Sequence, residues 1–346
     1  MAQRADAGPG QGFARYAAGA RGRANPRTRV TPLILFAVAL LLSVLIYPVA
    51  IGWLARARMG QQIREEGPSA HHAKAGTPTA GGIVFLLLAF ILYLVADRSI
   101  AGAFVLIALF LGGALGFFDD VAAIRGGRNL GLKARQKIVV QLLTGALLGW
   151  LALRWGLTNQ LVPFDGRHAI GGWIILVAAL AVAAGSNAFN LTDGSDGLAA
   201  GTGAVTFGAL ALIAVLQHHP GVGLMPAVLA GVLVGFLFYN LFPARLFMGD
   251  TGSLALGTAM VAAAIATGFL WYLPLLALVF TIETVSVIAQ VASFKLTGKR
   301  IIRMSPLHNH FIVAGWRETP LALWFWTGSL VAAVLALALA RPGSGA

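Results

Sequence analysis

The sequence predicts an all-α polytopic membrane protein with about ten transmembrane helices, and three observations support this fold class. Of its 346 residues, 58% are hydrophobic and only 11% are charged, whereas soluble domains carry roughly 25% charged residues. Uncharged apolar runs such as 33–54 and 320–340 reach the roughly 20 residues that a helix needs to cross a bilayer. Cysteine is absent, which excludes disulfide bonds and thiolate metal sites.

Ten apolar segments bounded by polar or Gly/Pro-rich stretches are the expected helices. They cover residues 31–54, 80–96, 100–118, 138–154, 169–187, 197–216, 222–240, 252–270, 274–292 and 320–340. We expect them to form one domain over residues 31–340, between a flexible N-terminal tail (1–30) and a short C-terminal tail (341–346). The many Ala and Gly residues are typical of helices that pack closely in lipid.

The charges predict how these helices are oriented. An even number of helices places both termini on one side, so the odd-numbered connections (55–79, 119–137, 188–196, 241–251 and 293–319) share the other. These connections hold 15 of the 25 Lys and Arg residues, and the positive-inside rule makes their side cytoplasmic. The six Arg residues of the N-terminal tail oppose this orientation, but five connections outweigh one tail. The net charge of +13 is thus expected to set topology and to meet anionic lipid or phosphate, not nucleic acid.

Carboxylates are scarce, and their positions indicate a functional site. Of the 12 Asp and Glu residues, five fall at or near the cytoplasmic ends of apolar segments. These are Asp119, Asp120, Asp193, Asp196 and Asp250. A carboxylate at the end of a membrane helix is costly unless it is paired, bound to a metal or exposed to water. One alone would mark only where a helix stops, but five from three connections favour active-site loops on the cytoplasmic side.

The first two of these carboxylates are adjacent. Asp119 and Asp120 follow a glycine-rich apolar segment that ends in Phe117-Phe118. Side chains one residue apart on a helix diverge by about 100°, so the two are not expected to share one ligand site. We expect them to have two different catalytic roles.

A second polar group lies between two strongly apolar segments. Its members are Asn187, Asn190, Asp193 and Asp196, at intervals of three residues. On a helix they would form one polar stripe, but Gly194 and Gly197 favour a turn with backbone N–H groups free for an anion. An ordinary turn followed by an Asp N-cap is the alternative. The density of polar groups favours a substrate-binding site.

The connection from Tyr239 to Ser253 contains residues suited to three kinds of interaction with a substrate or a metal ion. Arg245 can pair with an anion, Phe247 offers an aromatic stacking surface, and Asp250 is an oxygen ligand suited to Mg²⁺. A hard cation held by one or two carboxylates and by phosphate oxygens is the usual arrangement for phosphoryl chemistry. Asp250 is therefore the expected metal ligand.

Two short basic stretches are further candidates. Lys74 and Thr77 lie in a glycine-rich stretch that lacks the spacing of a Walker phosphate loop, so a simple helix-entry turn explains it equally well. Lys133, with Arg135 and Lys137 beside it, follows the Asp pair. Phosphate binding and the marking of topology fit this second stretch equally.

Residues 295–310 combine four Lys and Arg residues with two His residues. His308 and His310 can share a face on an extended segment but not on a helix, and either could bind phosphate or relay protons. Glu283 lies near the middle of the ninth apolar segment, where it is either functional or a structural partner of a neighbouring helix.

In this order the motifs resemble the MraY family, the phospho-N-acetylmuramoyl-pentapeptide transferases of the polyprenyl-phosphate sugar-1-phosphate transferase superfamily. The likeness extends from about Lys74 to Trp316. The motifs are Lys74-Ala-Gly-Thr-Pro-Thr, Phe118-Asp-Asp, Gly131-Leu-Lys-Ala-Arg-Gln-Lys137, Asn190-Leu-Thr-Asp-Gly, Phe247-Met-Gly-Asp-Thr-Gly-Ser and Ser293-Phe-Lys-Leu-Thr-Gly-Lys-Arg300. The chain departs from the family at Asn309, where the family typically has His, and at Ile312, where it usually has an acidic residue.

The resemblance implies a reaction and a location. Such an enzyme transfers phospho-MurNAc-pentapeptide from UDP-MurNAc-pentapeptide to undecaprenyl phosphate with Mg²⁺, forming lipid I and UMP in the first membrane step of peptidoglycan synthesis. It would be a multi-pass protein of the bacterial cytoplasmic (inner) membrane, with its active site on the cytoplasmic side of the lipid bilayer. A homodimer is compatible with this interpretation but is not required by it.

The resemblance also implies roles for single residues. Asp250 matches the family's metal ligand and Asp119 its candidate base. Nucleotide contacts fall on Lys74, Asn190, Asp193, Asp196, Asn240 and Phe247, to which we add Thr77 and Asn187 as substrate-binding residues. The expected catalytic set is Asp119, Asp120, Asp250, His308, His310 and Lys133.

Three alternatives stay open. A sister enzyme that uses UDP-GlcNAc shares the Asp-rich core, although the His308 segment and the 293–300 motif favour the muramoyl enzyme. A membrane transporter would also line a water path with charges, but it often has repeated halves with interrupted helices, which the sequence lacks. The transfer itself is either a direct attack by the lipid phosphate or a two-step route through an aspartyl-phosphate.

Overall fold

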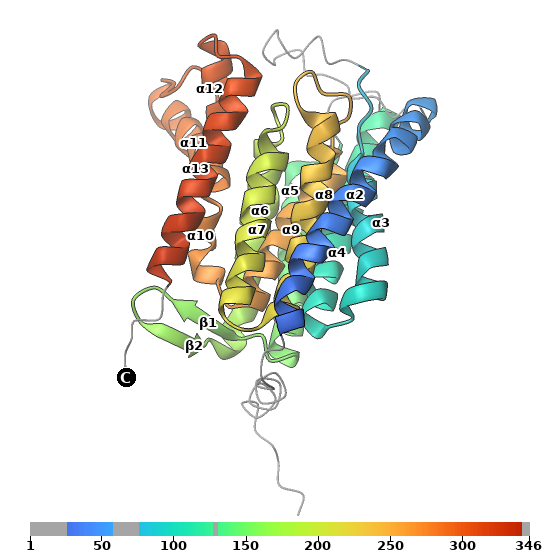
Figure 1. The fold of residues 1–346 in the computed structure, drawn as a ribbon. Coiled ribbons are helices and arrows are strands. Elements are labelled where there is room, and N and C mark those ends of the chain that lie inside the picture. The colour runs from blue at the N-terminus through green and yellow to red at the C-terminus, as the bar shows by residue number, and fades with distance from the viewer. Residues whose placement is uncertain (1–25, 58–75, 127–130, 341–346) are drawn as a thin grey trace, which may run out of the picture.

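The computed structural model describes residues 26–57, 76–126 and 131–340. These residues form a bundle of helices with one small β-hairpin at one end (Figure 1). Nine of the described helices are long and apolar enough to cross a membrane, and a shorter apolar helix covers residues 82–97. The prediction of an all-α polytopic membrane protein with about ten helices is confirmed. Residues 1–25 and 341–346, which belong to the predicted tails, lie outside the described residues.

The nine long helices and the shorter α3 alternate in direction along the described part of the chain (Figure 1). They are α2 (Pro26–Arg56), α3 (Gly82–Leu92), α4 (Ile100–Gly126), α5 (Ala134–Arg154), α6 (Ile174–Thr192), α7 (Leu198–Leu216), α8 (Leu224–Asn240), α9 (Gly249–Thr267), α11 (Leu278–Thr297) and α13 (Glu318–Leu339). Shorter elements are η2 (Tyr93–Asp97), η3 (Gly171–Trp173), η4 (Pro220–Gly223), η5 (Leu270–Tyr272), α10 (Leu273–Leu276) and α12 (Leu307–Val313).

Several helices include polar residues that the sequence assigns to connections, and α4 and α9 matter most for the site. α4 continues to Gly126, beyond the expected end at residue 118, and α9 begins at Gly249, before the expected start at 252. The reason is that Asp120 accepts hydrogen bonds from the backbone N–H groups of Asp250 and Thr251, which would otherwise be unpaired in the first turn of α9. Asp119, Asp120 and Asp250 therefore lie on helices and not on loops.

Glycines bring α4 and α9 into close contact at this end of the bundle. A Cβ atom on Gly116 would lie 2.0 Å from the carbonyl oxygen of Asp250, and one on Gly112 would lie 2.5 Å from that of Leu254. Only glycine allows two helix backbones to approach so closely. Because Asp119 and Asp120 follow Gly116 by one turn, this packing holds both beside the N-terminus of α9, a helix whose side chains are almost all buried.

The hairpin lies at the opposite end of the bundle from α12 (Figure 1). Strands β1 (Asn159–Val162) and β2 (Gly166–Ala169) pair antiparallel, with Asn159 opposite Ala169 and Val162 opposite Gly166. The buried Gln160 amide donates to the carbonyl oxygens of Leu157 and Ile265, at 3.0 Å each. This hairpin lies mainly between the expected helices 138–154 and 169–187 and was not predicted from the sequence.

Candidate active site

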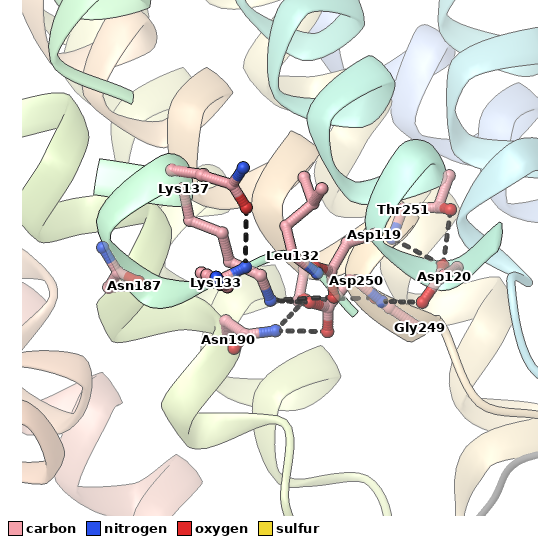
Figure 2. A network of polar contacts seen from close by, with 12 residues as sticks. Asp119, Asp120, Leu132, Lys133, Lys137, Asn187, Asn190, Gly249, Asp250 and Thr251 are labelled. Atoms are coloured by element: carbon pink, nitrogen blue, oxygen red, sulfur yellow. Dashed lines mark hydrogen bonds and ion pairs between the residues drawn. The ribbon is translucent and has the colours of Figure 1, made fainter. Parts of the chain in front are cut away.

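Lys137 joins two of the predicted carboxylates at the end of the bundle opposite the hairpin (Figure 2). Its Nζ atom lies 2.8 Å from Oδ2 of Asp119 on α4 and 2.8 Å from Oδ2 of Asp250 on α9. The Asp119 side chain is buried, and those of Lys137 and Asp250 are partly exposed. Two carboxylates and one ammonium group, from three helices, thus face a common point.

Backbone groups of neighbouring elements interact with both carboxylates. Asp250 is in the first turn of α9, where the helix dipole stabilises a carboxylate. Asp119 accepts a hydrogen bond of 2.7 Å from the backbone N–H of Leu132, the residue two positions before α5 begins. The segment that leads into α5 therefore binds Asp119 and brings Lys137 to the same place.

Asp120 points to different partners from those of Asp119, as the divergence of adjacent helical residues requires. Its Oδ1 atom accepts from the backbone N–H of Asp250 at 3.1 Å. Its Oδ2 atom accepts from the backbone N–H of Thr251 at 2.9 Å and from the Thr251 hydroxyl at 2.6 Å. Asp120 thus caps the N-terminus of α9 from a neighbouring helix and fixes the position of Asp250.

The two asparagines of α6 lie at different depths. Asn190 donates from Nδ2 to Oδ1 of Asp250 at 2.8 Å and to the Ser253 hydroxyl at 2.9 Å. Asn187, one turn earlier, donates to Oε1 of Gln141 at 2.7 Å and to the carbonyl oxygen of Ala183. Asn190 is therefore part of the carboxylate cluster (Figure 2), whereas Asn187 lies beneath it.

The donor set fits a magnesium ion that also needs phosphate ligands. Within the described ranges, no group of three or more His, Asp or Glu residues is placed to hold a metal, so a site made only of protein ligands is not formed there. Mg²⁺ usually takes one or two carboxylates and fills its other positions with water and phosphate oxygens. One oxygen of Asp250 and one of Asp119 contact the same cation, the Lys137 ammonium group. A positive charge is therefore stable at this point.

The turn between α6 and α7, residues 193–197, carries the other predicted donor-binding acids. Asp193 ends α6 and is partly buried. Asp196 is only 2% exposed, and its Oδ2 atom accepts from the backbone N–H of Ala244 at 2.9 Å. Asn240, also 2% exposed, accepts from the backbone N–H of Gly197 and donates to the carbonyl oxygen of Leu246. Asp196 and Asn240 therefore tie the turn to the connection after α8.

Phe247 and Thr77 lie in two segments that pair with each other. The backbone N–H of Phe247 donates to the carbonyl oxygen of Pro78 at 2.9 Å, and its own carbonyl oxygen accepts from the N–H of Gly81 at 2.9 Å. This pairing carries both segments to the start of α9. Lys74, the predicted cation of the same stretch, lies outside the described residues.

The predicted His pair lies on a short helix, α12, and the two rings diverge as a result. His308 is fully buried, and its Nδ1 atom lies 3.1 Å from Oε2 of Glu283. His310 is partly exposed, and its Nδ1 atom accepts from the backbone N–H of Arg303 at 3.1 Å. Between them, Asn309 is buried, with no hydrogen-bond partner for Oδ1 in the described part of the chain.

The structure brings Lys137, and not the predicted Lys133, into contact with Asp119 and Asp250. Lys133 is exposed at the residue before α5, where its backbone N–H donates to the Gln136 side chain. Lys137, for which phosphate binding and the marking of topology fitted the sequence equally, makes the central contacts. The expected helix began only at residue 138, whereas α5 begins at Ala134, so the sequence did not distinguish Lys137 from its basic neighbours. Thr251, Ser253 and Glu318 were also missed, because a single Ser, Thr or Glu residue carries no distinctive pattern.

Comparisons with known proteins agree with this geometry. Residues 100–268 match the model of a family described as Glycosyl transferase family 4. The chain is 46% identical to a phospho-N-acetylmuramoyl-pentapeptide-transferase of Desulforudis audaxviator, over 88% of this chain and 97% of that protein. It is 44% identical to the enzymes of the same name from Geobacillus thermodenitrificans and Halalkalibacterium halodurans, over 88% and 89% of this chain and 96% and 97% of theirs. With this identity over nearly its whole length, the chain belongs to the family of phospho-N-acetylmuramoyl-pentapeptide transferases.

Proposed function

We propose that the protein transfers phospho-MurNAc-pentapeptide from UDP-MurNAc-pentapeptide to undecaprenyl phosphate, with lipid I and UMP as products. Membership of the family supports this reaction. The single structural observation that carries it is the cluster of Asp119, Lys137 and Asp250 from three helices at one end of a transmembrane bundle. A lipid phosphate at the membrane surface and a water-soluble nucleotide sugar can meet only at such an end.

The main physical obstacle to this reaction is charge. A lipid phosphate must approach a diphosphate that is already negative, so positioning and electrostatic stabilisation should supply most of the rate enhancement. Lys137 supplies one fixed positive charge between the two carboxylates. Asp250 would hold Mg²⁺, with Asp119 beside it, and the bound ion would neutralise charge on the diphosphate oxygens.

We assign direct attack to the lipid phosphate. One of its oxygens forms a bond to the sugar-proximal phosphorus, and the bond from that phosphorus to the bridging oxygen breaks, so that UMP leaves. A phosphate monoester has a second pKa of about 6 and is largely deprotonated at neutral pH. Asp119 therefore orients the attacking phosphate and accepts whatever proton remains, and Asp120 acts by fixing Asp250. Recovery of a phosphorylated enzyme after incubation with the nucleotide donor alone would favour the two-step route instead.

The nucleotide donor would bind between the 193–197 turn and the paired segments of Thr77 and Phe247. Asp193 and Asn190 face this region from the end of α6, and Phe247 offers a surface for the uracil ring. Lys74, Lys133 and His310 are proposed as phosphate contacts from the rim, and Asn187 as a residue that acts from beneath Asn190. The many Lys and Arg residues of the connections at this end support a position on the cytoplasmic side of the membrane, and membership of the family supports the bacterial inner membrane.

A UMP-release assay with two donors tests the proposal. The purified protein in lipid nanodiscs is given undecaprenyl phosphate, Mg²⁺ and either UDP-MurNAc-pentapeptide or UDP-GlcNAc. We expect UMP and lipid I from the first donor only. UMP release from UDP-GlcNAc alone would assign the protein to the sister reaction, and donor flux across vesicles without UMP release would favour a transporter.

A further inference from the structure

Two buried carboxylates take no part in the chemistry proposed above. Glu283 on α11 is 0% exposed and Glu318 at the start of α13 is 7% exposed. A buried acid in a membrane protein is costly unless other groups satisfy it. The partners of Glu283 and Glu318 therefore indicate what these residues are for.

Glu318 binds the turn between α6 and α7 directly. Its Oε2 atom accepts from the Ser195 hydroxyl at 2.9 Å and from the backbone N–H of Asp196 at 2.8 Å. Hydrogen bonds to an ionised acceptor are about twice as strong as neutral ones. Asp196 in turn accepts from the backbone N–H of Ala244, so Glu318 anchors a chain of contacts that crosses the floor of the proposed donor site.

Glu283 reaches the same turn through His308. Its two carboxylate oxygens lie 3.1 Å from the backbone nitrogen and 3.1 Å from the Nδ1 atom of His308. Because an ionised carboxylate can only accept hydrogen bonds, we assign the Nδ1–H tautomer, in which Nδ1 donates to Glu283 and Nε2 is left as an acceptor. Among the residues that the structure describes, this buried Nε2 atom has no hydrogen-bond partner, and a Cβ atom on Gly194 would lie 2.4 Å from it. The His308 ring therefore packs against Gly194 of the turn.

The start of α7 is held by α13 as well. The Trp326 indole N–H donates to the carbonyl oxygen of Gly197 at 3.1 Å, and a Cβ atom on Gly201 would lie 2.0 Å from Cε2 of Trp326. The turn thus meets three side chains from the C-terminal helices, namely Glu318, His308 and Trp326.

We infer that Glu283 and Glu318 are positioning residues that hold the 193–197 turn in the conformation that binds the nucleotide donor. The inference rests on the proposed function, which places the donor at this turn. It also gives His308, predicted from the sequence to be catalytic, a positioning action through Gly194, against which its buried ring packs. The acids do not bind the donor themselves, since a buried negative charge would repel its diphosphate.

Steady-state kinetics of variants of the full-length protein in nanodiscs test this inference. Glu318→Ala removes the acceptor of two hydrogen bonds to the turn, and we expect the KM for UDP-MurNAc-pentapeptide to rise by about tenfold or more. The KM for undecaprenyl phosphate should stay unchanged. Glu318→Gln keeps an acceptor oxygen and should recover most of the donor KM. Glu283→Gln should raise the donor KM in the same way.

Two further variants keep the test decisive if Glu318→Ala does not fold. Ser195→Ala removes one donor to Glu318 without touching the carboxylate, and it should raise the donor KM by a smaller factor with no change for the lipid. Asp165→Asn, an exposed acid on the distant hairpin, is the matched control and should change neither KM. An equal rise in the KM values for the nucleotide donor and the lipid, or an unchanged donor KM in Glu283→Gln and Ser195→Ala alike, would overturn the positioning role.

The activity of the wild-type protein distinguishes a failure of the positioning role from a failure of the proposed function. If it releases UMP from UDP-MurNAc-pentapeptide and the variants leave the donor KM unchanged, only the positioning role fails. If the wild-type protein releases no UMP from this donor, the proposed function fails and the positioning role fails with it.

Discussion

The Nζ atom of Lys137 lies 2.8 Å from the Oδ2 atom of Asp250, and this contact joins a helix start on α5 to a helix start on α9. The same ammonium group lies 2.8 Å from Asp119. A cation between two carboxylates keeps them close in the absence of other ligands, and it can turn toward a phosphate when a metal ion binds Asp250. Lys137 is thus both a structural counter-ion and a candidate phosphate contact.

Lys137→Met should lower kcat for UMP release by about 100-fold or more, the usual cost of removing a single stabilising group from a transition state. Arg135→Met is the matched control, because Arg135 is an exposed basic residue on the same first turn of α5. It should retain activity close to that of the wild type. Equal losses in the two variants would mean that Lys137 contributes only to the general positive charge of this surface.

Asp119→Asn should lose activity only, whereas Asp120→Asn should lose both stability and activity. Asp120 accepts three hydrogen bonds at the start of α9, so the amide substitution should lower the free energy of unfolding by about 1–3 kcal/mol and reduce activity through the displacement of Asp250. Asp119→Asn should keep the wild-type melting temperature and lose activity. Thermal unfolding followed by intrinsic fluorescence, together with UMP release, measures both properties. A thermally unchanged Asp120→Asn protein would contradict the capping role.

Gly116→Ala should destabilise the protein and misplace the carboxylates, because its Cβ atom would overlap the backbone of Asp250. Overpacking of a close contact of this kind costs about 1–3 kcal/mol. Gly208→Ala is the matched control, since no atom lies within 4 Å of its added Cβ and helix propensity favours Ala by roughly 1 kcal/mol. We expect a lower melting temperature only for Gly116→Ala. A stable and active Gly116→Ala protein would show that α4 and α9 do not need this approach.

The sequence was sufficient for the helices and for the grouping of the carboxylates, but not for the partners within the group. Apolar length and the burial cost of charge are local properties of the chain, so the spans and the cluster of Asp119, Asp120 and Asp250 could be predicted. The choice of Lys137 over Lys133 depends on how α5 is rotated against α4 and α9, which no local pattern contains. The same holds for Glu318, whose partner Ser195 is 123 residues away in the chain.

The roles of buried residues were the least predictable part of the site. Asp196, Asn240 and His308 carry the residue types expected of substrate contacts, yet their hydrogen bonds are mostly to backbone groups or to other buried side chains. Residue type indicates what a side chain can bind, whereas burial decides whether a substrate can reach it. Their direct contact with the substrate stays a prediction.

The most direct test of the central claim is UMP release from UDP-MurNAc-pentapeptide as a function of Mg²⁺ concentration, measured for the wild type and for Asp250→Asn. We expect the wild type to require Mg²⁺ and to reach saturation, and Asp250→Asn to show little release at any Mg²⁺ concentration while retaining the wild-type melting temperature. Full, Mg²⁺-saturable release by Asp250→Asn would contradict the assignment of Asp250 and with it the proposed site.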